Sequence, residues 1–423
     1  MINNLKASII KVPVKEQLSA LINNGEVIEV RIIGTEKGVV SGYYDNLDKL
    51  EHDLYKYNGR HNIFFTMNEL NGSFDSVDKN VLSNHSINTT KDKDISISER
   101  RRLASFPEFS VNNILNGTFF SNFDKYAVDQ FVMRDYIREN KVRLDLALKN
   151  NYHDVYVYND YLIKQEYPLN ESSLRNLIDR INSISNKYLN NSKIYYSVVP
   201  DKNYFVNNGN LKMNYDLLIS KMNSELSSFN YIDIMNSLSL EDYYYSDSHF
   251  KQENIVKVAN VILDKMGNSY YKDINYNMQN VGVFKGVYSY QVPVKIKEDN
   301  INILSNEYID NAIVYDNLNK IDINVYDKSK INSWDLYDIY LGGAKGLLTI
   351  YNNLASSDDE LIVFRDSYGS SLVPLLIISY KKIIVIDTRY IYSNILDNYV
   401  EFKGQDVLFL YSVSTINNSF TVK

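Results

Sequence analysis

The sequence has no cysteine. This excludes disulfides, thiolate-bound metals, iron–sulfur clusters and a cysteine nucleophile. Histidine is also scarce, with five residues among 423. The search for an imidazole base is therefore short, and neither a metal nor another cofactor is expected.

Long apolar runs are missing as well. The most apolar stretch, residues 371–386, is interrupted by Lys381 and Lys382, whereas a membrane-spanning helix needs about 20 apolar residues in succession. Residues 1–30 contain no apolar core or small-residue cleavage site of the kind found in signal peptides. We therefore expect neither a transmembrane segment nor an export signal, which places the chain as written in the cytoplasm.

The chain carries no excess of basic residues. It has 45 Lys and Arg against 52 Asp and Glu, a net charge of −7. A general surface for nucleic acid or anionic lipid is therefore not expected. Hydrophobic residues at 44% and charged residues at 23% are typical of globular proteins. At roughly 150 residues per domain, the length predicts two or three domains.

The first hundred residues predict a small α/β segment. Val27–Ile33 and Asn62–Thr66 have strand patterns, residues 34–42 supply turn residues, and Leu47–Tyr57 has helical spacing. Residues 71–94 are rich in Ser, Asn, Thr, Asp and Lys, which is the composition of a linker.

We therefore place a domain boundary near residue 95, between a small segment over 1–95 and a large domain over 96–423. In the large domain, short apolar strands alternate with helices, which favours a parallel sheet covered on both faces. The expected helices are 111–115, 123–148, 169–189, 252–266 and 372–380, and the expected strands are 194–199, 360–364, 382–386 and 406–411, with a hairpin over 154–163 around Asn159 and Asp160.

One histidine has the setting of a catalytic base. His249 follows Asp247 by two residues, and on an extended backbone these two side chains face the same way. A carboxylate placed in this way orients an imidazole in hydrolase triads. Asp-x-His also occurs freely in turns, so the pattern alone leaves both interpretations open. His52, His61, His85 and His153 lie in polar surroundings and are interpreted as solvated surface residues.

A nucleophile is sought where a buried strand turns into a helix, because the helix N-terminus offers N–H groups to an oxyanion. Ser367 lies in such a turn, between the strand 361–364 and a helix over 370–380. Sites in α/β proteins lie at this carboxyl edge of the sheet. The alternative is that Asp366 or Ser367 only caps the helix.

Four ordered blocks over residues 98–423 resemble the DHHW proteins, which belong to the SGNH-hydrolase-like group that includes alginate O-acetyltransferases. The blocks are Glu99–Pro107 for "ENRxLAxFP", Gly117–Asp135 for "GxF…YxxDQFPxRD", Tyr245–Phe250 for the DHHW block, and Asp366–Tyr390 for "KDSYxxSFVPFL…VIDxRY". The resemblance implies an α/β, SGNH-hydrolase-like layered sheet with helices on both faces, with the small α/β segment in front of it.

The resemblance also implies a Ser-His-Asp acyl-transfer site. Ser367 would be the nucleophile, His249 the general base and Asp247 its orienting carboxylate. The chain departs from the motif, since Ser248 and Phe250 replace the second His and the Trp of DHHW.

Four further residues are candidates for the oxyanion or substrate site, each with an alternative interpretation. Gly342 and Gly343 resemble the family's "GGN" turn, which implies an oxyanion or substrate role, but Ala344 replaces the Asn. The alternative is a plain tight turn. Tyr368 and Arg389 are expected at the substrate, against the alternatives of packing for Tyr368 and of an ion pair with Asp387 or Asp366 for Arg389.

The N-terminal segment resembles something else, the leading segment of phage and plasmid primase-polymerases. Three stretches carry this resemblance: residues 38–45, 62–68 and 89–95. The metal-binding carboxylates of that family would follow at the point where the DHHW-like sequence begins. We therefore expect a noncatalytic segment without polymerase activity.

The leading hypothesis is a serine-dependent carbohydrate O-acetyltransferase or acetylesterase. The resemblance implies a polysaccharide acceptor outside the cell membrane and admits a membrane-bound protein as acyl donor. The alternative is a noncatalytic carbohydrate-binding or polysaccharide-assembly protein that keeps the fold. A third hypothesis, nucleic-acid binding by the N-terminal segment, is disfavoured by the acidic charge balance.

Overall fold

The computed structural model of the chain describes residues 5–7, 28–35, 38–44, 62–67, 95–96, 101–131, 134–268, 274–333, 335–355 and 357–423. Within it the chain divides into two compact units, Met1–Asn140 and Lys141–Lys423. The boundary predicted near residue 95 and the primase-like leader stay predictions. The predicted helix over residues 47–57, the linker, and His52, His61 and His85 lie outside the described residues.

The first unit contains a four-stranded antiparallel sheet in the order β1-β4-β2-β3. Its strands are β1 (Leu5–Ala7), β2 (Ile28–Thr35), β3 (Gly38–Tyr44) and β4 (Asn62–Met67). The two strand patterns of the sequence correspond to β2 and β4. The residues from Gly38 onward, predicted as part of a turn, instead form β3 and pair with β2.

The same unit contains the short pair β5 (Ile95–Ser96) and β6 (Arg101–Arg102) and the helices α4 (Val111–Leu115) and α5 (Thr118–Asp129). The single helix predicted over 123–148 is two helices, because α5 ends at Asp129 and α6 (Arg134–Lys149) begins after it. The Asp129 carboxylate accepts hydrogen bonds from Arg101 and from the Ala104 N–H. These bonds tie the end of α5 to the preceding segment.

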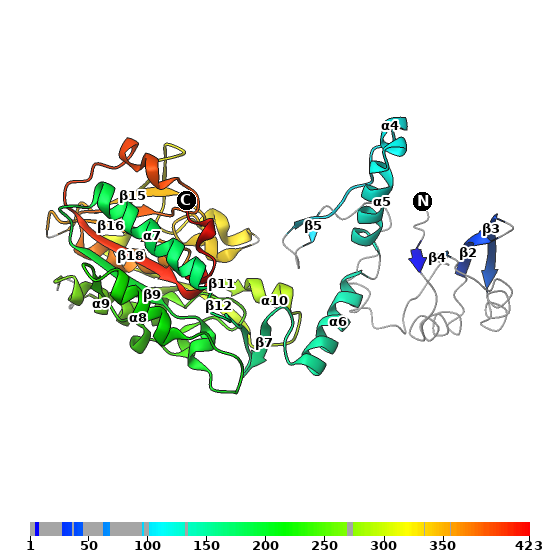
Figure 1. The fold of residues 1–423 in the computed structure, drawn as a ribbon, viewed down its shortest axis with the longest axis horizontal. Helices are drawn as coiled ribbons and strands as arrows, with labels where there is room; N and C mark the ends of the chain where they lie inside the picture. The colour runs from blue at the N-terminus through cyan, green and yellow to red at the C-terminus, as the bar shows by residue number, and fades with distance from the viewer. Residues whose placement is uncertain are drawn as a thin grey trace. The chain divides into compact units, whose positions relative to one another are not determined.

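The second unit is built on an eight-stranded mixed sheet (Figure 1). In spatial order its strands are β10 (Asn230–Tyr231), β9 (Ile194–Val199), β18 (Asp406–Ser412), β16 (Glu360–Arg365), β17 (Lys382–Ile386), β15 (Leu347–Tyr351), β13 (Ile313–Asp316) and β14 (Ile321–Ile323). The first five are parallel, and four of them, all except β10, were predicted. The last three are antiparallel to their neighbours, so the sheet is mixed and not parallel throughout.

Both faces of the sheet are buried. Leu361 and Val363 of β16 face one apolar core, and Ile362 and Phe364 face the other, because successive side chains of a strand point to opposite faces. The first core is covered by α9 (Val256–Lys265), α11 (Glu307–Asp310), α12 (Gly369–Leu372) and the 3₁₀ helix η7 (Val373–Ser379), and the second by α7 (Glu171–Tyr188), α8 (Tyr215–Glu225) and α13 (Val413–Asn417). The predicted layered α/β fold with helices on both faces is confirmed.

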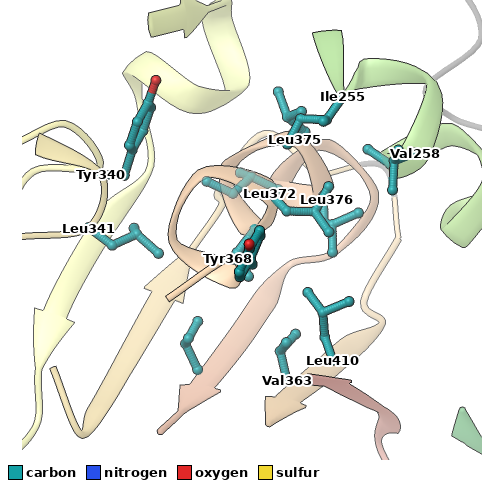
Figure 2. Packing of buried hydrophobic residues seen from close by; sticks show 14 of the residues in the cluster. Ile255, Val258, Tyr340, Leu341, Val363, Tyr368, Leu372, Leu375, Leu376 and Leu410 are labelled. Atoms are coloured by element: carbon teal, nitrogen blue, oxygen red, sulfur yellow. The ribbon is translucent and has the colours of Figure 1, made fainter. Parts of the chain in front are cut away.

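The segment that follows β16 packs into the first core. Figure 2 shows Tyr368 and Leu372 beside Leu341, with Ile255 and Val258 on the other side of the helix. The sequence predicts one helix here, but η7 replaces it from Val373 onward. Pro374 lacks an N–H and so cannot make the α-helical bond to the carbonyl four residues earlier.

The second unit also contains β7 (Val155–Tyr158), β8 (Tyr161–Lys164), β11 (Asn277–Phe284), β12 (Asp299–Ser305) and α10 (Val287–Gln291). The hairpin β7–β8 was predicted. Its turn residues Asn159 and Asp160 both have positive φ, 46° and 66°, as a type I′ turn requires.

Candidate active site

Ser367 lies two residues beyond β16, in a turn that hydrogen bonds hold in place. Oδ1 of Asp366 accepts from the Tyr368 N–H at 3.1 Å. Its Oδ2 accepts from the N–H and the hydroxyl of Ser412, at 2.7 and 2.6 Å. Ser412 is the last residue of β18, so Asp366 ties the turn to the neighbouring strand. The helix that follows has Tyr368 as its N-cap and no side-chain cap hydrogen bond, so neither Asp366 nor Ser367 caps it.

Asp247 and His249 lie in a loop between Tyr243 and Phe250, which form an isolated antiparallel bridge. The Tyr244 N–H donates to the His249 carbonyl at 3.0 Å. Within the loop, Oδ1 of Asp247 accepts from the His249 N–H at 3.0 Å. The pair lies in a tight turn and not on the extended backbone that the two-residue spacing suggested.

The structure brings Asp247, His249 and Ser367 together in one chain of hydrogen bonds. Nδ1 of His249 lies 2.5 Å from Oδ1 of Asp247, and Nε2 lies 2.8 Å from Oγ of Ser367. An Nδ1–H that donates to the carboxylate leaves Nε2 as the acceptor for the serine hydroxyl. This arrangement lets the imidazole remove a proton from Ser367.

Asp247 is held in its charged form. Burial by itself would raise the pKa of this carboxyl, since its side chain is 3% exposed. The electrostatic attraction and hydrogen bond of the His249 ring, together with the backbone N–H groups of His249 and Val287, outweigh that effect and hold the pKa of Asp247 well below its usual range. An ionised carboxylate at this position stabilises an imidazolium at His249.

A second buried carboxylate holds the same loop through hydrogen bonds. Asp299 at the start of β12 accepts from the N–H groups of Tyr245 and Ser246, at 2.8 and 2.7 Å. The Ser246 hydroxyl donates to Asp299 at 2.6 Å and accepts from the Gly286 N–H at 2.9 Å. A Cβ on Gly286 would lie 2.3 Å from the Cβ of Asp247. Only glycine therefore permits this close approach.

A pocket of about 250 Å³ opens beside Ser367. The predicted Tyr368 and Arg389 line it, and so do residues after β18, because the carboxyl ends of β16, β17 and β18 meet here. His153, interpreted from the sequence as a surface residue, is exposed and also lines the pocket. The remaining lining residues are Lys164, Ser248, Val287, Tyr288, Gln291, Ser412, Ser414 and Thr415.

Arg389 is paired with Asp387, as one of the alternatives foresaw. Its Nε and one terminal nitrogen lie 2.9 and 2.7 Å from the two carboxylate oxygens. Arg365 approaches the same carboxylate from the protein interior at 3.5 Å. Asp387 thus holds Arg389 in one orientation at the pocket wall.

Tyr368 has a packing role and a polar role together. Its ring lies edge-on to Phe250, with centroids 5.1 Å apart, and its hydroxyl donates to the Ser248 carbonyl at 2.7 Å. Phe250, which replaces the Trp of the motif, is fully buried. The ring at this position therefore still packs under the loop that carries His249.

Gly342 and Gly343 are not among the residues that line the pocket beside Ser367. Both have positive φ, 68° and 78°, and the Gly343 N–H donates to the Tyr340 carbonyl at 3.2 Å. A Cβ on Gly343 would lie 2.3 Å from Oδ1 of Asp338. These are the features of the plain tight turn that was the alternative for this pair.

Fold comparison identifies relatives of this architecture. A DHHW family protein from Eubacterium siraeum matches with a TM-score of 0.50 and 17% identity, over 64% of this chain and 95% of that one. The chain has the fold of a DHHW family protein. Bacillus cereus PatB1 matches with a TM-score of 0.49 and 13% identity, over 62% of this chain and 96% of that one. The O-acetyltransferase domain of Pseudomonas putida AlgJ matches with a TM-score of 0.39 and 9% identity, over 62% of this chain and 92% of that one.

No family model and no curated protein sequence matches the chain. The DHHW fold is thus recognised here through structure and through the short motif blocks. Among the described residues, no group of His, Asp and Glu side chains has the arrangement of a metal site. None of the helices in the described part of the chain has the length and apolar character of a membrane span.

Proposed function

We propose that the chain is a serine-dependent acyltransferase or esterase that acts on carbohydrate O-acetyl groups, with Ser367, His249 and Asp247 as its triad. The observation that carries the proposal is the continuous hydrogen-bonded chain from Asp247 through His249 to Ser367, which ends in a pocket. The carbohydrate substrate and its extracytoplasmic, cell-surface setting rest on the family resemblance of the sequence blocks.

The geometry supports a two-step acyl transfer. Oγ of Ser367 attacks the acetyl carbonyl while Nε2 of His249 takes the hydroxyl proton, and Asp247 stabilises the imidazolium. The imidazolium then gives this proton to the departing alcohol oxygen, and the acetyl group stays on Ser367. In the second step, a sugar hydroxyl or water gives its proton to His249 while its oxygen attacks the acetyl carbonyl. The acyl bond to Oγ of Ser367 then breaks, and His249 returns the proton to this oxygen.

The oxyanion formed in each step needs hydrogen-bond donors. The turn hydrogen bonds use the N–H groups of Tyr368, Gly369 and Ser370. Among the described residues the Ser367 N–H has no hydrogen-bond acceptor, so we assign it to the oxyanion. Gly342 and Gly343 do not line the pocket, so their N–H groups are not assigned to the oxyanion.

The absence of these glycines from the pocket wall favours a second candidate function. With Ala344 in place of the motif's Asn, the chain would bind a carbohydrate without turning it over. The two candidates differ in a single observable, the chemical reactivity of Ser367.

The test is hydrolysis of a small activated acetate ester by the wild type and by Ser367→Ala. A matched control is Ser370→Ala, since Ser370 is also buried, in α12, and its backbone N–H donates to the Ser367 carbonyl. We expect Ser367→Ala to lose about a thousandfold or more of the rate and Ser370→Ala to stay within a few-fold of wild type. Equal rates in the wild type and Ser367→Ala would refute the enzyme and favour the binding protein.

A further inference from the structure

Tyr337 lies on the 3₁₀ helix η6 (Leu336–Ile339), which none of the motif blocks includes. Its ring is stacked on the imidazole of His249, with centroids 3.9 Å apart and planes inclined by 13°. The two nitrogens of that imidazole are held by Asp247 and Ser367. The ring of Tyr368 also contacts this imidazole, with centroids 4.9 Å apart and planes inclined by 53°. Of the two tyrosines, Tyr337 lies nearly parallel to the imidazole and so restrains the direction of its plane.

The hydroxyl of the same tyrosine reaches the nucleophile's turn. It lies 3.2 Å from the Ser367 carbonyl oxygen and 2.8 Å from Oγ of Ser371. One side chain thus contacts His249 with its ring and the backbone of Ser367 with its hydroxyl. This is how a group can keep the base and the nucleophile at a constant separation.

Tyr337 is itself firmly held. It is 4% exposed, and its N–H donates to the Asp335 side chain at 3.1 Å. The ring of Tyr340 packs edge-on against it at 5.1 Å, and the Tyr340 hydroxyl donates to the Asn302 carbonyl at 2.6 Å. A ring anchored in this way can impose its orientation on its neighbour.

We propose that Tyr337 is a positioning residue that holds the imidazole plane of His249 in line with Ser367. This inference rests on the proposed function. The stacked aromatic face also favours a positively charged imidazole, which is the form of His249 after it has taken the serine proton. In this proposal the ring of Tyr337 orients His249, and its hydroxyl holds the turn that carries Ser367.

Two substitutions separate these parts. Tyr337→Phe keeps the ring and removes the hydroxyl, whereas Tyr337→Leu removes the ring. Tyr380→Leu is the matched control, because Tyr380 is another buried tyrosine, 1% exposed, whose hydroxyl contacts Met266. The readouts are the NMR signals of the His249 ring protons, assigned by their loss in His249→Gln, and kcat and KM for the acetate ester.

We expect Tyr337→Phe to keep the upfield ring-proton signals that stacking produces and to retain kcat within a few-fold. Tyr337→Leu should shift these signals downfield and lower kcat by about 10- to 100-fold, with KM changed by no more than about twofold. Tyr380→Leu should leave signals and kinetics at wild-type values.

Unchanged signals and kcat in a folded Tyr337→Leu protein would overturn the proposal, and so would equal effects of Tyr337→Phe and Tyr337→Leu. Effects of the same size in Tyr380→Leu would also overturn it, because they would indicate a general loss of stability. If the wild type fails to hydrolyse the ester, the proposed function fails, and the His249 ring signals alone decide whether Tyr337 orients the imidazole.

Discussion

Nε2 of His249 lies 2.8 Å from Oγ of Ser367, although 118 residues separate the two in sequence. Ser367 is placed by the end of β16, and His249 by a loop that Asp299 and Gly286 hold. The distance therefore depends on two separate parts of the fold.

Asp247→Asn tests the orienting carboxylate. Asparagine preserves the shape of the side chain but cannot stabilise an imidazolium and favours the wrong imidazole tautomer. We expect kcat for the acetate ester to fall by about 10³- to 10⁴-fold, with KM nearly unchanged. The measurement is steady-state kinetics on protein whose circular dichroism matches the wild type. A loss below about tenfold would show that Asp247 does not act through His249.

Gly286→Ala tests the close approach of two loops. The new Cβ would lie 2.3 Å from the Cβ of Asp247 and 2.5 Å from the Ser246 carbonyl oxygen, so the catalytic loop must move. A displacement of about 1 Å at a reacting group costs about 100-fold in rate, and we expect a loss of this order in kcat.

The control for this substitution is Gly267→Ala. Gly267 has a φ of 84° and no atom within 4 Å of an added Cβ. The alanine should cost about 1 kcal/mol of folding stability through backbone strain, without an effect on kcat. A Gly286→Ala enzyme as active as the Gly267→Ala control would contradict the assigned role of the loop contact.

The parts of the fold that the sequence predicts well are continuous apolar runs. Ile194–Val199 coincides with β9, which is buried along its whole length. The strands β13 and β14 were not predicted because they are short and form a hairpin at the edge of the sheet, without a helix between them. β15 was not predicted either, and two 3₁₀ helices, not an α-helix, separate it from β14. A hairpin edge leaves little periodicity for a sequence pattern to detect.

The candidate site divides in a similar way. Asp247, His249 and Ser367 were found because their residue types and local settings are chemically distinctive. Tyr337 and Asp299 were not found, because an ordinary tyrosine or aspartate gains its role only from contacts with residues far away in the sequence. Asp299 lies 53 residues from Ser246 in the sequence. The polar residues after β18 could have been predicted from the same rule that pointed to Ser367, namely that sites in α/β proteins lie at the carboxyl edge of the sheet.

Asp387 is expected to matter more for stability than Arg365, although the two form one ion pair. Loss of the carboxylate in Asp387→Ala leaves two buried or half-buried guanidinium groups without their counter-charge, which typically costs about 3 to 5 kcal/mol. Arg365→Met removes a buried charge whose Nε and one terminal nitrogen have no hydrogen-bond partner, and Asp387 keeps Arg389. Urea unfolding should therefore show the smaller loss for Arg365→Met. The reverse order would contradict this account of the ion pair.

Lys202 predicts a dependence of stability on pH. Burial lowers the pKa of this lysine to about 7, against the opposing charges of Asp247 and Asp299. Its ammonium donates to the carbonyls of Tyr244 and Tyr245 at 3.0 and 3.2 Å. Between about pH 7 and pH 10 the unfolded chain binds this proton more tightly than the folded one, so the free energy of unfolding rises with pH in that window.

Lys202→Met removes this titration. The difference in unfolding free energy between the wild type and the variant should therefore rise by roughly 2 to 4 kcal/mol from pH 7 to pH 10. Urea unfolding of both proteins at several pH values measures it. A difference that stays constant over the window would show that Lys202 keeps its ordinary proton affinity in the folded protein.

The central claim is that Ser367 is a nucleophile activated by His249, and covalent labelling tests it most directly. The protein is treated with a serine-directed sulfonyl fluoride, and its intact mass and tryptic peptides are measured by mass spectrometry, with Ser367→Ala and His249→Gln alongside. We predict a single adduct on the peptide that carries Ser367, absent from Ser367→Ala and at least about 100-fold slower in His249→Gln. No adduct in the wild type, or one that forms equally fast in all three proteins, would contradict the claim.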